Sequence, residues 1–151
     1  MGIPSRHYRS VEDLPGECRV FPLTGGLLLP GGDLQLNVFE PRYLRLVDDA
    51  LAGNRLIGMI QPHVAGNEAT DPTPELARVG CLGRLTAFAE THDGRYEITL
   101  TGVCRFAAVA EMAADTPYRW VRPDYGVYAD DLAPGDPDAA VQAVGREPLF
   151  A

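Results

Sequence analysis

Residues able to carry covalent chemistry are scarce in this sequence. It contains no lysine, and its only serines, Ser5 and Ser10, lie in a lead-in without a regular hydrophobic period. A P-loop needs a lysine to reach the phosphates, and Schiff-base catalysis needs one as well. A nucleophile elbow needs the frame Gly-x-Ser-x-Gly, which neither serine has. The sequence therefore excludes a P-loop ATPase, a Ser–Lys protease and an elbow-type serine hydrolase.

Three cysteines, Cys18, Cys81 and Cys104, leave one class of nucleophile open. Either Cys81 or Cys104 could act with His63 or His92 as the base. A reactive thiolate, however, needs a helix N-terminus or a cationic neighbour, whereas both cysteines fall on predicted strands. The odd count and wide spacing argue against a disulfide framework and a structural zinc site. We expect buried thiols in a reducing compartment and keep a small cysteine-dependent enzyme as an alternative.

Histidines and acids show no pattern typical of a metal site or of acid–base catalysis. His7, His63 and His92 are isolated from one another and from other ligand types at metal-binding spacing. The adjacent pairs Asp48-Asp49 and Asp130-Asp131 would diverge on a helix, so we interpret them as solubilising charge. The sequence predicts no metal, no cofactor and no catalytic residue.

The charge pattern bears on partners. The net charge is −8, and all thirteen basic residues are arginines. Nucleic-acid binders carry a basic patch or stripe, so we expect no nucleic-acid partner. The first twenty residues lack the apolar core of a signal peptide. The apolar runs, such as 27–29, are too short to span a membrane. We therefore expect a cytoplasmic protein that does not contact membranes.

One helix is predicted at residues 41–52. Pro41 suits the first helical position after a cap at Glu40, and Gly53 is a natural end. Phe39 and Leu44 occupy the positions of a hydrophobic staple. An apolar stripe follows at spacings of three and four, comprising Tyr43, Leu44, Val47, Ala50 and Leu51.

Strands and loops are predicted before and after this helix in the sequence. Periods of two and short apolar runs predict strands at 19–23, 34–38 and 56–60, the last one covered on both faces. Residues 62–77 have the composition of a long loop. Further strands are predicted at 118–121 and 125–128. An acidic linker over 130–138 and the start of a helix over 138–145 follow.

Residues 79–106 predict a β-hairpin. Asp93-Gly94 indicates a two-residue type I′ turn, which needs positive φ at both positions. On the return strand one face carries the apolar residues Tyr96, Ile98, Leu100, Cys104 and Phe106. Gly102 falls on that inner face, which predicts a close approach of another backbone or a sharp bend.

Seven ordered segments together resemble the LON substrate-binding domain, the N-terminal domain of ATP-dependent Lon proteases, which also occurs in small stand-alone bacterial proteins. The segments are residues 20–23, 27–31, 36–43, 56–60, 79–84, 93–96 and 100–106. The resemblance covers about residues 18–128. It implies an α+β fold, mainly β: a PUA-like pseudo-barrel of mixed strands with one packed helix. It divides the chain into a lead-in over 1–17, the domain over 18–128, and an acidic linker with a short helical tail over 129–151.

The resemblance also implies a function. The expected role is non-catalytic recognition of unfolded or flagged protein segments, with a protease as a further partner and without ATPase or peptidase domains in the chain. The expected peptide-binding residues are Phe39, Glu40 and Arg42 at the helix start and Met59 on the third strand, because aromatic and methionine side chains suit varied apolar segments. The helix start is also explained by capping alone. An RNA-binding PUA-like module stays an alternative, and the oligomeric state stays open.

Overall fold

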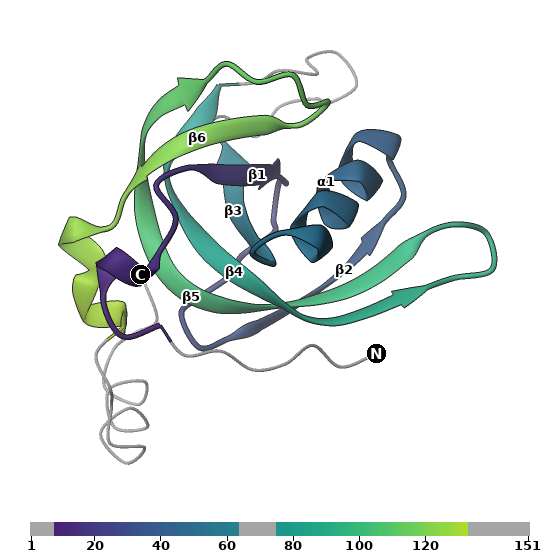
Figure 1. The fold of residues 1–151 in the computed structure, drawn as a ribbon, viewed down its shortest axis with the longest axis horizontal. Coiled ribbons are helices and arrows are strands. Elements are labelled where there is room, and N and C mark those ends of the chain that lie inside the picture. The colour runs from purple at the N-terminus through teal and green to yellow at the C-terminus, as the bar shows by residue number, and fades with distance from the viewer. Residues whose placement is uncertain (1–7, 64–74, 133–151) are drawn as a thin grey trace.

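The computed structural model describes residues 8–63 and 75–132 of the 151-residue chain (Figure 1). Its strands are β1 (Cys18–Pro22), β2 (Asp33–Val38), β3 (Leu56–Pro62), β4 (Leu76–Glu90), β5 (Tyr96–Met112) and β6 (Arg119–Asp124). Helix α1 (Pro41–Ala52) and the short 3₁₀ helices η1 (Val11–Asp13) and η2 (Gly126–Leu132) complete the described elements. None of the described helices has the length and apolar character needed to cross a membrane.

The strands form a sheet that closes on itself. Their order is β2-β5-β4-β3-β1-β6, and β6 also pairs with β5, so β5, β4, β3, β1 and β6 make a ring. β1 and β3 run parallel, whereas the other strand pairs are antiparallel. α1 lies beside this ring, next to β2 (Figure 1). The predicted α+β pseudo-barrel with one packed helix is confirmed, whereas its PUA-like relationship stays a prediction.

Two apolar cores hold these elements together. Every strand of the ring contributes to the first, which includes Val20, Ile60, Leu82, Phe106 and Val121. The second gathers around α1, whose Tyr43, Leu46, Val47 and Ala50 are buried against β2, β4 and β5. The predicted stripe is thus confirmed at Tyr43, Val47 and Ala50. Leu44 and Leu51 are only partly buried, and the stripe omitted Leu46.

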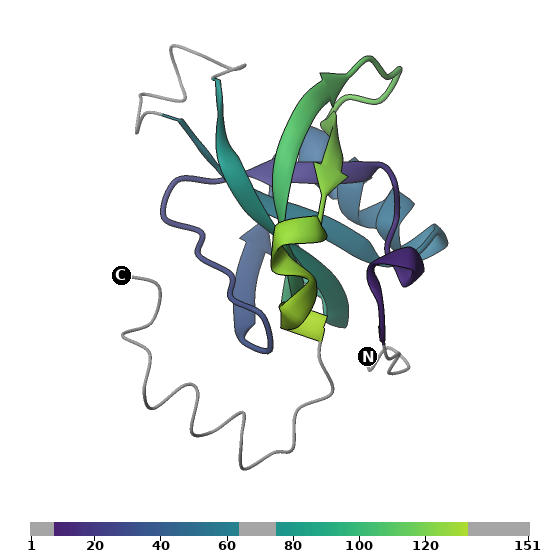
Figure 2. The same ribbon diagram turned by 90° about the vertical axis from the view of Figure 1, so that its left-hand side faces the viewer.

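Two local predictions were wrong. Residues 126–128 begin η2 and Tyr125 precedes it outside any strand, because the Asp124 carboxylate accepts a hydrogen bond from the Gly126 N–H and starts a turn. η2 packs on β5 (Figure 2).

The hairpin turn is not type I′, since Gly94 has positive φ but Asp93 does not. The Gly94 N–H donates to the Thr91 carbonyl, as in a type I turn followed by a glycine bulge. The predicted hairpin itself is confirmed, and its strands run further, from Leu76 and to Met112.

The predicted close approach at Gly102 is confirmed. The Gly102 N–H donates to the Gly32 carbonyl at 2.8 Å, and the Gly31 N–H donates to the Gly102 carbonyl at 2.8 Å. The β1–β2 connection therefore lies directly on the middle of β5. The predicted helix over 138–145 and most of the predicted loop over 62–77 lie outside the described residues.

Candidate functional site

Two grooves border the β1–β2 connection, residues 23–32. The first, which we call the Phe39 groove, has a volume of about 100 Å³ and lies between the end of β1 and the corner that joins β2 to α1. The second, the Leu27 groove, measures about 240 Å³ and lies between the connection and strands β3 and β4. Both have walls made largely of apolar side chains.

Phe39 lies at the rim of the first groove with 64% of its surface exposed. The predicted staple would have drawn this ring against Leu44, but the ring stays largely in solvent. Glu40 precedes α1 in an extended conformation and its side chain does not cap the helix. Instead the Glu40 carboxylate pairs with the Arg42 Nε at 3.4 Å. Three of the four expected binding residues therefore lie together at the helix start.

An aromatic stack supports this corner. The Tyr43 ring stacks on the Phe21 ring with centroids 4.1 Å apart, which joins the first full turn of α1 to β1. The Arg42 guanidinium lies 4.7 Å from the centroid of the Tyr43 ring, within the range of a cation–π interaction. These two ring contacts hold the floor of the Phe39 groove next to the Glu40–Arg42 ion pair.

Met59 is not part of that surface. It is 2% exposed and belongs to the core around α1. Its neighbours explain the burial, since it pairs with Phe21 of β1 and with Cys81 of β4. Met59 does line the Leu27 groove. Because Phe21 lines the other groove, the Phe21–Met59 pair connects the two.

Leu27 and Val79, which the sequence interpretation missed as site residues, lie at the Leu27 groove with 62% and 44% exposure. The signal for Leu27 was present: an apolar run between two glycine pairs, Gly25-Gly26 and Gly31-Gly32. A run of that kind in a short connection cannot bury every member, because glycine-bounded loops follow the surface. Nothing local marked Val79, which precedes Gly80 in β4.

Arg105 also lines the Leu27 groove, and its guanidinium is paired with the Asp131 carboxylate. The Arg105 Nε and Nη2 donate to the Asp131 carboxylate at 3.0 and 2.9 Å, and its backbone N–H donates there too. These hydrogen bonds raise the pKa of the Arg105 guanidinium. The Tyr128 ring lies 4.8 Å from it. Asp131 is therefore a specific partner rather than the solubilising charge that we predicted.

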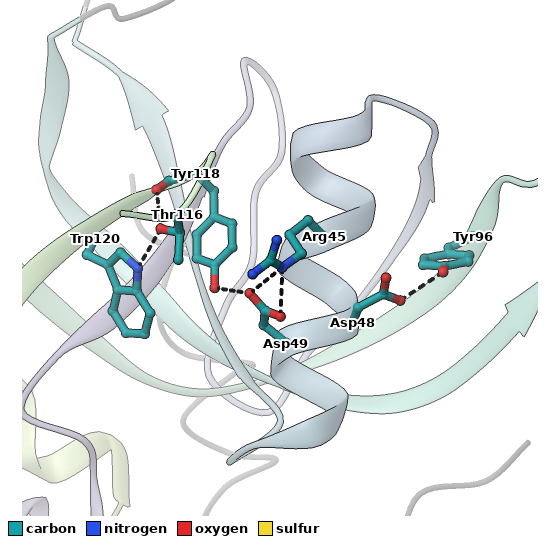
Figure 3. Close-up of polar contacts among 7 residues, drawn as sticks. All are labelled: Arg45, Asp48, Asp49, Tyr96, Thr116, Tyr118 and Trp120. Carbon is teal, nitrogen blue, oxygen red and sulfur yellow. Dashed lines mark hydrogen bonds and ion pairs between the residues drawn. The ribbon is translucent and has the colours of Figure 1, made fainter. Parts of the chain in front are cut away.

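Asp48 and Asp49 also have specific partners. Figure 3 shows them pointing to opposite sides of α1, as the spacing predicted. The Tyr96 hydroxyl of β5 donates to Asp48 at 2.8 Å, and the Tyr118 hydroxyl donates to Asp49 at 2.7 Å. The bond from Tyr118 lowers the pKa of Asp49, and the bond to Asp48 raises the pKa of Tyr96 to about 12. These contacts fasten α1, and hence Phe39, to β5 on one side and to the residue that precedes β6 on the other.

The described residues offer little for catalysis. All three cysteines are free and buried, as predicted. Burial raises the pKa of Cys18 and of Cys81 to about 12 and that of Cys104 to about 11, so the thiols stay protonated at neutral pH. His63 and His92 are exposed. Within residues 8–63 and 75–132, no cluster of three or more His, Cys, Asp or Glu side chains has the arrangement of a metal site.

Thiol labelling tests this arrangement. In the folded chain at pH 7.5 we expect the three cysteines to react with a disulfide reagent at least about 100-fold more slowly than a free thiol, because reaction requires an accessible thiolate. Unfolding in guanidinium should expose all three thiols to the reagent at the same time. One fast-reacting thiol in the native chain would contradict the buried, protonated state and restore the cysteine-enzyme alternative.

Comparisons with known proteins point to one family. A family model described as the ATP-dependent protease La (LON) substrate-binding domain matches residues 17–144. Lon protease 2 of Myxococcus xanthus is 29% identical over 114 residues, 75% of this chain and 13% of that protein. A Lon protease of Anaeromyxobacter dehalogenans is 30% identical over 71% of this chain and 12% of its own length. The chain thus spans a small part of these curated relatives.

Solved structures show the same likeness. A Lon N-terminal domain protein from Xanthomonas campestris matches with a TM-score of 0.57 and 28% identity, over 72% of this chain and 59% of that one. The N-terminal domain of a Mycobacterium avium complex Lon protease matches with a TM-score of 0.56 over 72% of this chain and 54% of that one. At 14% identity the second likeness concerns the fold alone.

Proposed function

Because the chain belongs to the LON substrate-binding domain family, we propose that it is a non-catalytic module that recognises unfolded or flagged protein segments for a protease. Phe39, Glu40 and Arg42 are the residues that contact the segment. Met59 is buried and lines the neighbouring Leu27 groove, and it supports this site only through its pairing with Phe21. The buried, protonated thiols support a role in binding rather than in covalent chemistry.

The exposed ring of Phe39 carries this proposal. A phenylalanine with 64% of its surface in solvent forgoes much of the roughly 1.5–3 kcal/mol that burial of such a side chain provides. Single exposed apolar residues are ordinary on protein surfaces. Phe39, however, lies on a groove lined by Phe21, Leu23 and Tyr43. An apolar side chain of a bound segment would cover both the groove and the ring, and aromatic residues are enriched at such interfaces.

Phe39→Ala is expected to weaken binding of unfolded proteins about 5- to 30-fold. That factor corresponds to about 1–2 kcal/mol of lost apolar burial. The measurement is fluorescence anisotropy with a panel of labelled, reduced and carboxymethylated model proteins. Val127→Ala is the matched control, since Val127 is 86% exposed on η2 and lines neither groove.

Two results would contradict the proposal. One is the absence of measurable binding by the wild-type chain across the panel. The other is an equal loss of affinity in Phe39→Ala and Val127→Ala, which would indicate non-specific adsorption to any apolar surface.

A further inference from the structure

Among the described strands, β2 lies at the end of the strand order, so one of its two edges has no partner strand. It pairs with β5 from Asp33↔Thr101 to Val38↔Tyr96, and no other described strand pairs with it. Sheet edges are usually protected by lysine, proline, a bulge or an inward-pointing charge. β2 has none of these: its register is continuous, its sequence is DLQLNV, and its only charged residue, Asp33, is exposed at one end. This edge therefore lacks the side-chain and backbone devices that would oppose pairing with another extended chain.

The Phe39 groove lies along this edge. It touches three consecutive β2 residues, Leu36, Asn37 and Val38, but no residue of β5, which covers the other edge. Its opposite wall is the end of β1. A different hollow of about 510 Å³ touches β2, β5 and β4 together, and so lies on the face of the sheet. A chain extended along the free edge of β2 (Figure 1) would pass over the Phe39 groove and not over that hollow.

We propose that the recognised segment binds as an extended strand added to the free edge of β2, with one apolar side chain in the Phe39 groove. This inference rests on the proposed function and specifies its geometry. Main-chain hydrogen bonds supply affinity whatever the side chains are, and the groove selects one apolar position. Such a mode suits a module that accepts many different unfolded sequences.

Charge narrows the choice of segment. Residues 34–39 are uncharged, with Asp33 at one end and the Glu40–Arg42 ion pair at the other. The whole chain carries a net charge of −8. A segment with an apolar centre and basic flanks is therefore favoured over one with acidic flanks, which like charges would repel. The occupant that we infer is an extended, uncharged stretch bounded by lysine or arginine.

The test uses the full chain and the labelled peptide Lys-Thr-Thr-Phe-Thr-Thr-Lys, whose single phenylalanine sets its register. Each amide of the central five residues is N-methylated in turn, which removes one N–H and adds bulk without changing a side chain. In an added strand only alternate N–H groups face β2. We expect affinity losses of at least about 10-fold at alternate positions and of less than about 2-fold between them. A version with glutamate flanks should bind more weakly.

Amide exchange of β2 gives an independent readout that needs no variant. On peptide binding, the β2 amides that do not bond to β5 should exchange at least about 10-fold more slowly, while those already bonded to β5 should change little. If the peptide binds and depends on Phe39, but the methylation profile is flat and β2 exchange is unchanged, strand addition is wrong and the proposed function stands. If neither peptides nor unfolded proteins bind, the proposed function fails with it.

Discussion

Gly102→Ala is expected to lower the free energy of unfolding by about 3 kcal/mol or more, or to prevent folding. A Cβ at this position would overlap the Leu29 carbonyl oxygen and lie 2.6 Å from the carbonyl carbon. Both are backbone atoms, and the hydrogen bonds from Gly31 and to Gly32 hold that backbone against β5. Relief would require the whole β1–β2 connection to move. Urea unfolding followed by circular dichroism measures the change.

Gly16→Ala is the matched control for this substitution. A Cβ at Gly16 would meet nothing within 4 Å, and its φ is not in the left-handed region. Its free energy of unfolding should change by less than about 0.5 kcal/mol. A Gly102→Ala chain as stable as wild type would mean that the connection does not lie on β5 and that both grooves are built differently.

Phe106→Ala is expected to lower the free energy of unfolding by about 3–5 kcal/mol. The ring is fully buried inside the strand ring and meets Tyr125 edge-to-face with centroids 6.5 Å apart. Gly58 and Gly80 make room for the ring, since a Cβ at Gly58 would lie 3.1 Å from the Phe106 Cζ and one at Gly80 would lie 2.7 Å from it. At roughly 2–4 °C per kcal/mol for a chain of this size, Tm should fall by about 6–20 °C. Calorimetry gives this value directly.

Phe39→Ala makes the same chemical change at an exposed position and serves as the control. Its Tm should stay within about 2 °C of the wild-type value, because little surface is buried there. The pair separates stability from recognition: Phe106→Ala should affect folding, and Phe39→Ala only binding. If Phe39→Ala unfolded as readily as Phe106→Ala, its loss of binding could not be attributed to the groove.

The elements that local signals define could be predicted from the sequence. Helix α1 has the predicted bounds because Pro41 and Gly53 mark its ends, and the inner face of β5 follows from its period of two. The closure of the ring could not be predicted, because β1 pairs with β3 and β6 through residues far apart in sequence. Asp131 was misjudged for the same reason, since its partner Arg105 is remote in the chain.

The candidate site was predicted in part. Phe39, Glu40 and Arg42 adjoin one another because they are consecutive or nearly so, at a helix start that the sequence defines. Met59 was a less consistent choice, because the continuous apolar run around it already predicted a strand covered on both faces. The free edge of β2 depends on which strands do not pair with it, and no local pattern encodes that property.

The pairing of Cys18 in β1 with Val121 in β6 has a consequence for synthesis of the chain on the ribosome. Contacts between residues so far apart form slowly, because the intervening chain must first be ordered. The ring cannot close until Asp124 has been translated. Until then β1 and β5 both present open edges to the crowded cell. A module proposed to capture unfolded chains would thus itself be open to capture during that interval.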